Sequence, residues 1–386
     1  MKKRLIATSA SILMILTGCT IPGMPGESEN ENTNLVTQQS TSENETNEYL
    51  RYNVKSSAFS KNRELITYQI NNRVDMNEIE TGLMSISEEY FPADEYIYQE
   101  GQYLEEIRSW IRRESNDELG LNPPIEVTED MNWEEVMEIK KESPMYLGYV
   151  HEQNYVDKEG NLKGISIGLA MNSVDYITVD DNMGLKHFDT KEISGLDKPS
   201  GKMVSEGKKM AETIISRIRQ NENLANVPVV ISLYQLEKKN SVLPGSYFSY
   251  SYLDANDKSI KKWRDTEKQE YLFPSDEAEE HDRVVSNRFK GLEEDMNSFF
   301  KDRTIQLVSK GTYIDTDMQK MVINVNTDMT KYGEIVGLVQ AFTPEIQDFF
   351  PHEPVYIYVK TPEGTAATIL LEPEQEPSVH IHDSGS

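Results

Sequence analysis

Two stretches of this chain resemble each other, and such a repeat restricts the fold to two related units. The first runs from Gly82 to Leu104 and the second from Gly291 to Ile314, an offset of 209 residues at the start and 210 at the end. The offset of 210 persists further along, where residues 144–147 (Pro-Met-Tyr-Leu) correspond to residues 354–357 (Pro-Val-Tyr-Ile). A register that holds this far favours a tandem duplication over chance similarity of composition.

Hydrophobic periodicity predicts the same order of elements in both stretches. Each begins with an apolar stripe at helical spacing, formed by Ile79, Leu83, Ile86 and Tyr90 in the first and by Phe289, Leu292, Met296 and Phe299 in the second. Apolar residues then alternate at 96–98 and at 305–307, as in half-buried strands. Gly160 and Gly364 lie further on, at the turns of closing hairpins. We therefore expect residues 82–104 and 291–314 to be equivalent helix–strand pairs, and the two hairpins to be equivalent.

These elements predict an α+β fold with two tandem related repeats, residues 54–200 and 201–375. Strands separated by helices could also form a parallel doubly wound sheet, but the closing hairpins favour mixed or antiparallel sheets. The second repeat carries an insertion from about Lys238 to Glu280, in which Phe248, Tyr250 and Tyr252 alternate to one side of a strand. Such an aromatic row packs against its own sheet or faces a partner. Residues 376–386 are expected to be a disordered tail.

The N-terminus has the layout of a secretory signal peptide. Three basic residues, Lys2–Arg4, precede an apolar run, Leu5–Leu16, that is too short for a spanning helix. The run ends in Leu16-Thr17-Gly18-Cys19, the pattern of bacterial lipoprotein signals. The alternative is an ordinary secreted protein with a chance cysteine. We expect diacylglyceryl transferase to modify the Cys19 thiol and lipoprotein signal peptidase to cut between Gly18 and Cys19.

Cysteine usage supports lipid attachment. Cys19 is the only cysteine among the 386 residues, so the chain forms neither an intramolecular disulfide nor a thiolate metal cluster. Residues 1–18 would be the signal peptide. Residues 19–53 are rich in Glu, Asn, Ser and Thr and would form a lipidated, disordered tether. The lipid on Cys19 would hold the protein on the extracellular face of the cell membrane.

Charge and motifs exclude several classes of function. The net charge of -27 argues against binding nucleic acid or other polyanions. Phosphate-binding and dinucleotide-binding motifs are missing from the sequence, and His151-Glu152 lacks the second histidine of a zinc protease. His380 and His382 could bind a divalent ion on an extended strand, but a frayed tail would not hold them rigidly. The sequence therefore predicts no catalytic residue, no metal and no cofactor.

Three short segments carry a resemblance to a known family. Residues 82–84 (Gly-Leu-Met), 99–104 (Gln-Glu-Gly-Gln-Tyr-Leu) and 120–123 (Gly-Leu-Asn-Pro), in this order after the lipoprotein signal, resemble the CamS family. Its members are lipoproteins of Gram-positive Firmicutes, described as sex pheromone precursors. The resemblance covers essentially the whole chain, from the signal through both repeats.

The resemblance implies that the named activity lies in the signal peptide. In the family, a short hydrophobic peptide from its end is secreted and induces conjugative plasmid transfer in enterococci. The family's peptide resembles Ala-Ile-Phe-Ile-Leu-Ala followed by Ser or Ala, and this chain keeps the Ile-Leu pair but differs at most other places. The corresponding candidate residues are Ile12, Leu13, Met14, Ile15, Leu16, Thr17 and Gly18.

Two further functions compete with a non-enzymatic surface lipoprotein of the CamS type. The lipid anchor, the tether and the two lobes together suggest a solute- or ligand-binding receptor. In such receptors, however, each lobe is usually built from alternating segments of the chain. A cell-wall-modifying enzyme would need carboxylates or histidines that converge in one cleft. A polar groove between the repeats would favour binding, whereas a cluster of mutually perturbed acids would favour catalysis.

Overall fold

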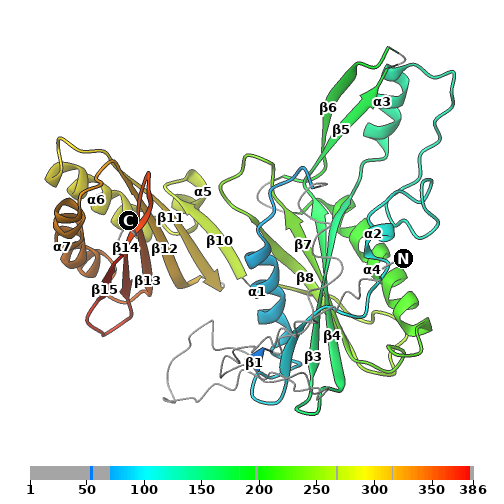
Figure 1. Cartoon of the computed structure of the whole chain (residues 1–386), viewed down its shortest axis with the longest axis horizontal. Coiled ribbons are helices and arrows are strands. Elements are labelled where there is room, and N and C mark those ends of the chain that lie inside the picture. Colours follow the sequence, from blue (N-terminus) through cyan, green and yellow to red (C-terminus); the bar gives the residue numbers. More distant parts are fainter. Residues whose placement is uncertain are drawn as a thin grey trace, which may run out of the picture. The chain divides into compact units, whose positions relative to one another are not determined.

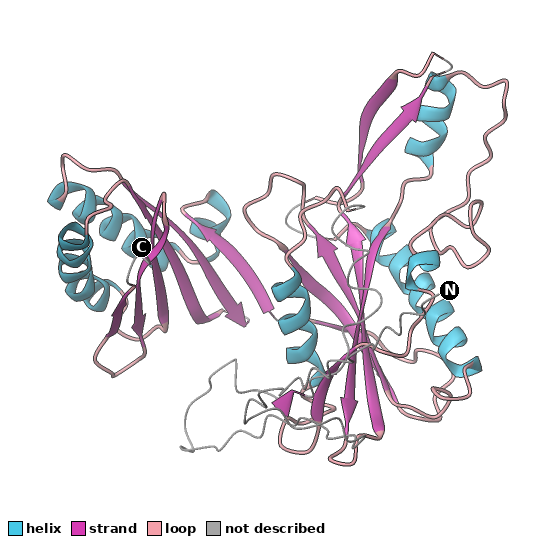
Figure 2. Cartoon of the chain, viewed as in Figure 1, coloured by secondary structure: helices cyan, strands magenta, loops and turns pink. Residues whose placement is uncertain are grey.

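The computed structural model describes residues 53–54, 70–181, 183–195, 199–266, 268–314 and 316–382 (Figures 1 and 2). The signal peptide, the candidate peptide 12–18, Cys19 and the tether up to residue 52 lie outside the described residues. The described part contains a seven-stranded sheet, a six-stranded sheet and a two-stranded sheet together with helices. The predicted α+β class with mixed and antiparallel sheets is therefore confirmed.

The first sheet has the strand order β1-β2-β3-β4-β7-β8-β9. Its strands are β1 (Asn53–Val54), β2 (Ile97–Glu100), β3 (Leu147–Val156), β4 (Leu162–Asn172), β7 (Val229–Leu236), β8 (Gly245–Leu253) and β9 (Arg264–Asp265). Two neighbouring pairs are parallel, β1 with β2 and β4 with β7, and the others are antiparallel. The parallel pair β4–β7 requires a crossover, and helix α4 (Gly201–Gln220) provides it.

Helices cover both faces of this sheet (Figure 1). On one face α4 and the short α2 (Ile107–Trp110) pack on strand residues such as Ile167, Ile231 and Leu233. On the other face α1 (Met76–Ser87) packs through Ile79 and Leu83. Because β7 is buried on both faces, its side chains are apolar almost throughout, Val-Val-Ile-Ser-Leu-Tyr-Gln-Leu.

The second sheet has the order β10-β11-β12-β13-β14-β15. Its strands are β10 (Lys268–Phe273), β11 (Ile305–Ile314), β12 (Asp317–Thr327), β13 (Val355–Thr361), β14 (Gly364–Leu371) and β15 (Ser378–Ile381). Helices α5 (Asp276–His281), α6 (Arg283–Phe299) and α7 (Tyr332–Phe349) bury a single core with one face of the sheet, including Phe289, Ile323 and Leu338. Only β12 and β13 are parallel, and α7 connects them.

A small unit combines a hairpin between β4 and α4 with a helix that precedes β3 in the sequence. Strands β5 (Val174–Asp180) and β6 (Lys186–Glu192) form an antiparallel hairpin, and α3 (Trp133–Glu142) packs on it (Figure 1). The Trp133 and His187 rings stack with centroids 3.8 Å apart. Met137, Ile177 and Val179 form its buried centre. This hairpin belongs to neither large sheet.

The two large sheets share one pattern of strand directions. In the first sheet, β2–β3, β3–β4 and β7–β8 are antiparallel, and β4–β7 is parallel. In the second sheet, β10–β11, β11–β12 and β13–β14 are antiparallel, and β12–β13 is parallel. The parallel pair is therefore the third of four in both sheets. A helical segment follows the first strand in each, and a crossover helix, α4 or α7, joins the parallel pair. Within the described residues, the unit around the first sheet has two elements that the second lacks at the equivalent places. These are the β5–β6 hairpin and helix α1, which precedes β2.

The predicted helix–strand pairs are confirmed as α1–β2 and α6–β11, but the predicted equivalences are wrong. By strand direction and order, the Gly160 hairpin β3–β4 corresponds to β11–β12, and the Gly364 hairpin β13–β14 corresponds to β7–β8. Local periodicity reports the type of an element, whereas its place in a sheet depends on long-range pairing. The offset of 210 residues therefore aligned elements of the same type, helix with helix and strand with strand, that occupy different positions in the two sheets.

Two expected boundaries also differ from the structure. The boundary between residues 200 and 201 falls inside the first unit, because α4, β7 and β8 follow it and complete the first sheet. The second sheet begins at Lys268. The tail expected to be disordered from residue 376 instead forms β15, whose backbone pairs with the open edge of β14.

Candidate functional site

Of the histidine pair that the sequence singled out, His380 lies on β15 and His382 directly follows this strand. The rings of His380 and His382 have centroids 4.7 Å apart, and Nε2 of His382 lies 2.9 Å from Oγ1 of Thr368. Within the described ranges, no group of three or more His, Cys, Asp or Glu side chains is placed to hold a metal ion. Two exposed imidazoles without a third ligand do not make a structural metal site.

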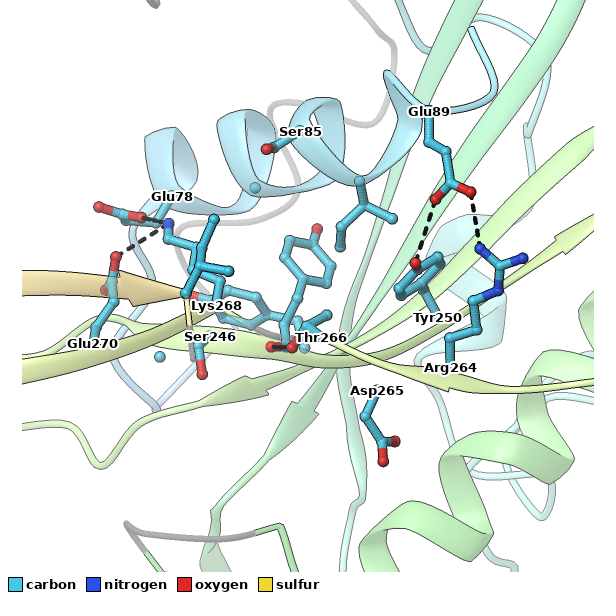
Figure 3. A pocket seen from close by; sticks show the side chains of 16 residues that line it. Glu78, Ser85, Glu89, Ser246, Tyr250, Arg264, Asp265, Thr266, Lys268 and Glu270 are labelled. Atoms are coloured by element: carbon cyan, nitrogen blue, oxygen red, sulfur yellow. Dashed lines mark hydrogen bonds and ion pairs between the residues drawn. The ribbon is translucent and has the colours of Figure 1, made fainter. Parts of the chain in front are cut away.

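A cavity of about 590 Å³ lies between α1, β8 and the segment that runs from β9 into β10 (Figure 3). Its volume is in the range of small-molecule sites. One face of α1 forms a wall of it, with residues at positions 78, 82, 85 and 86, and Glu89 extends this wall just beyond the end of the helix. At 1.5 Å per residue, the helical part of the wall from Glu78 to Ile86 is about 12 Å long.

Helix α1 is held in place at its start and along its buried side. Asp75 caps it, because the Asp75 carboxylate accepts hydrogen bonds from the backbone N–H groups of Asn77 and Glu78 at 3.1 and 3.4 Å. Gly82 allows α1 to approach β8 closely, since a Cβ at this position would lie 2.8 Å from Cδ2 of Tyr247. The buried Tyr247 hydroxyl in turn donates to the carbonyl oxygen of Ile79 at 3.0 Å.

The aromatic row predicted on β8 is divided between the two faces of the strand. A bulge opposite Leu233 and Tyr234 makes Phe248 an extra residue, and its ring packs on the α4 side. Tyr250 faces α1 and lines the cavity. Tyr252 stacks on Tyr90 with ring centroids 4.3 Å apart. The predicted alternation was wrong for Phe248 because periodicity does not reveal a bulge.

Four charged side chains form a closed cluster at one end of the cavity. Nζ of Lys268 lies 3.1 Å from Oε1 of Glu270 and 3.7 Å from Oε2 of Glu78. Nζ of Lys310, on β11, contacts Oε1 of Glu78 and lies 3.3 Å from Oε2 of Glu270. We call these four residues the ion-pair quartet. It joins α1 to the second sheet.

The quartet shifts the pKa values of Glu78 and Lys310 toward their charged forms. Burial raises the pKa of Glu78, but attraction by Lys310 and Lys268 outweighs this effect, so the pKa lies below its ordinary value. Burial lowers the pKa of Lys310, but Glu270 and Glu78 outweigh it, so that pKa lies above its ordinary value. Glu78 and Lys310 therefore stay ionised around neutral pH.

A second charged cluster closes the other end of the cavity. Nη1 of Arg264 donates to Oε1 of Glu89 and to the hydroxyl of Tyr90, both at 2.9 Å. The Tyr250 hydroxyl lies 3.5 Å from Oε2 of Glu89 (Figure 3). Burial and the neighbouring Glu89 raise the pKa of Tyr90, so this phenol stays protonated. Asp265 also borders the cavity, but Figure 3 shows its carboxylate pointing away from the other labelled side chains.

Sequence reasoning did not find this site. Its residues come from α1, β8, β9, β10 and the end of β11, which only the folded topology brings together. The one signal was a polar row along α1 and just after it, where Glu78, Ser85 and Glu89 recur at helical spacing beside the apolar stripe. On a surface helix such a row is ordinarily solvated.

Comparison with known proteins gives the family. The family described as CamS sex pheromone cAM373 precursor matches residues 58–377. The chain belongs to the CamS family. The match covers strands β2 to β14 of the two large sheets, and thus the family resemblance seen in the sequence is confirmed.

Solved structures of CamS proteins are similar to this chain. A structure of the C-terminal domain of the sex pheromone staph-cAM373 precursor from Staphylococcus aureus is 27% identical, with a TM-score of 0.63 over 80% of this chain and 96% of that one. A crystal structure of a sex pheromone precursor from Lactobacillus salivarius subsp. salivarius UCC118 is 26% identical, with a TM-score of 0.67 over 80% and 87%. The comparison with curated proteins gave no significant match.

Proposed function

We propose that this CamS protein is a surface-anchored, non-enzymatic lipoprotein whose cleaved signal peptide yields a short hydrophobic pheromone peptide. The observation that supports it most is the match to a pheromone precursor family in a chain that carries Leu16-Thr17-Gly18-Cys19. A diacylglyceryl group on Cys19 gives more membrane affinity than a single acyl chain. In the part of the chain that the structure describes, no helix is long and apolar enough to cross a membrane.

Mass spectrometry of the native protein tests the anchor. The mature N-terminus should be Cys19 carrying diacylglycerol. A Cys19→Ala chain should keep its signal peptide or be shed into the medium, while a Thr20→Ala chain should remain anchored as a matched control. An unmodified mature N-terminus at any other residue would contradict the proposal.

The cavity favours a second role for the folded part, as an extracellular ligand-binding protein. It lies between the two sheets, is open to solvent and combines tyrosine rings with hydroxyl and charged side chains. Native mass spectrometry of protein purified from its own cells should show a retained small molecule. The molecule should be absent from a Ser85→Leu chain, in which a larger side chain occupies the cavity. A protein that carries nothing would count against this role.

A further inference from the structure

We propose that the cavity beside α1 binds a neutral, hydroxyl-rich ligand, a short oligosaccharide. This inference rests on the ligand-binding role of the folded part. It follows from three properties of the cavity, which are its charge balance, its remaining hydrogen-bonding groups and the pairing of its strands.

The charge balance excludes an ionic ligand. Three carboxylates border the cavity with partners, Glu78, Glu89 and Glu270, and three cations pair with them, Arg264, Lys268 and Lys310. Each of the two clusters is thus neutral, in a chain whose net charge is -27, and the remaining carboxylate at the cavity, Asp265, points away from the other labelled side chains. An added ammonium or carboxylate would find no unpaired partner in either cluster and would still lose its hydration.

The remaining polar groups exclude a purely apolar ligand. The hydroxyl of Ser85 borders the cavity and forms no hydrogen bond with the described residues, whereas Figure 3 shows the hydroxyl of Ser246 on the side of β8 that points away from α1. Oγ1 of Thr266 donates to the carbonyl oxygen of Tyr247 at 2.6 Å and keeps its lone pairs for a donor. An apolar ligand would bury these groups without partners, at a cost for each. A ligand with its own hydroxyls can satisfy them.

The quartet end adds a buried acceptor. The Glu270 side chain is 6% exposed and its Oε1 accepts no hydrogen bond, although Nζ of Lys268 lies 3.1 Å away as an ion-pair partner. A neutral O–H donor suits this atom, because it adds a hydrogen bond without adding charge.

Strand pairing disfavours a peptide. Peptides commonly bind by adding a strand to an open sheet edge. Where β8 lines the cavity, however, both its edges are occupied, by β7 on one side and by β9 and Thr266 on the other. The rings of Tyr247 and Tyr250, with Ile86 and Ile314, offer apolar surface to the C–H groups of a sugar ring.

Calorimetric titration of the full chain carrying Cys19→Ser tests the ligand class without involving the lipid. The saccharide probes are chitotriose, maltotriose and cellotriose, and the comparison probes are spermidine and a trialanine blocked at both ends. We expect one saccharide to bind with a Kd of about 1 mM or tighter, and neither comparison probe to saturate at that concentration. Ser85→Leu should weaken saccharide binding by about tenfold or more. Ser205→Leu, on the exposed side of α4, is the matched control and should not change it.

Three outcomes overturn the inference. These are the absence of saccharide binding up to about 10 mM, tighter binding of spermidine or blocked trialanine, and equal binding by the Ser85→Leu and control chains. If saccharides fail while native protein retains another small molecule, the ligand-binding role stands and only the saccharide class falls. If the native protein also retains nothing, both fall.

Discussion

The carboxylate of Glu152 holds the loop that follows β2. Oε1 accepts hydrogen bonds from the backbone N–H groups of Gln102 and Tyr103 at 3.2 and 2.9 Å, and Oε2 accepts one from Leu104 at 2.9 Å. The Asn154 amide also donates to Oε1, at 2.8 Å. Burial raises the pKa of Glu152, and these donors offset part of that effect.

Replacing Glu152 by glutamine should destabilise the protein by about 2–3 kcal/mol, because the new amide N–H₂ would face backbone donors instead of accepting from them. Chemical denaturation followed by circular dichroism measures the loss. Glu159→Gln, at the exposed turn after β3, is the control and should change stability by less than about 0.5 kcal/mol. Equal stabilities of the two variants would show that the loop does not depend on the carboxylate.

The end of β2 and the loops after it contain two of the three segments that carry the family resemblance, and the third, residues 82–84, lies in α1. A Cβ on Gly101 would lie 2.6 Å from Cβ of Glu152, so only glycine fits there. Asn122 is fully buried, and its side chain accepts from the N–H and donates to the carbonyl of Leu147 at 2.8 and 2.9 Å. Gly101 and Asn122 therefore preserve the loops around the first sheet and lie outside the cavity, whereas Gly82 of the third segment lines it.

Among the elements, α1 has the largest influence on the candidate site. Its apolar stripe was predictable from sequence, since Ile79 and Leu83 recur at helical spacing and are buried. The ion pairs of Glu78 were not predictable. Their cations, Lys268 and Lys310, come from strands that lie about 200 residues further along the chain. The turn glycines were also predictable, as Gly160 and Gly364 have φ values of 86° and 132°.

The ion-pair quartet should make stability depend on pH in a defined window. The pKa of Glu78 is lowered in the folded state, so its contribution is present above the ordinary value of 4.5 and is lost as the pH falls through the folded value. The pKa of Lys310 is raised, so its contribution is present below 10.5 and is lost as the pH rises through the folded value.

Glu78→Gln should therefore cost about 1–2 kcal/mol at pH 7, between the values for surface and buried pairs. The cost should shrink toward zero in strong acid, where Glu78 of the wild type is itself protonated. Urea denaturation at a series of pH values measures both effects, with the exposed Glu95→Gln as control. A cost that stays constant with pH would show that packing, and not charge, connects α1 to the second sheet.

At the scale of the whole molecule, the two large sheets have separate cores. The core of the second sheet includes Ile323 and Leu338, and no residue of it is shared with the cores around the first sheet. The number of units was predictable because each repeats the same kinds of element. Their boundary was not, because β7 and β8 join the first sheet only through long-range pairing with β4.

Separate cores should unfold separately. Leu338→Ala in α7 and Ile214→Ala in α4 each remove a fully buried side chain, which should cost about 2–5 kcal/mol. Differential scanning calorimetry should show two transitions, the first variant lowering one Tm and the second lowering the other. A single transition that both variants lower equally would mean that the cavity interface makes the two sheets one cooperative unit.

The proposed pheromone and the folded part should be separable, because they meet only at the bond before Cys19. Cleavage there leaves 18 residues whose basic start holds the inner membrane face, while residues 12–18 carry no charged side chain. A remnant of this length cannot span the bilayer. At about 0.8 kcal/mol per buried methylene, the affinity of this remnant for the membrane is limited, so it can enter water.

Replacing residues 1–18 with an unrelated lipoprotein signal should abolish the peptide in the medium and keep the protein on the surface. Synthetic Ile-Leu-Met-Ile-Leu-Thr-Gly should then restore any clumping of plasmid-bearing enterococci, whereas a scrambled peptide should not. If the swapped strain still induces clumping, the signal does not come from this segment.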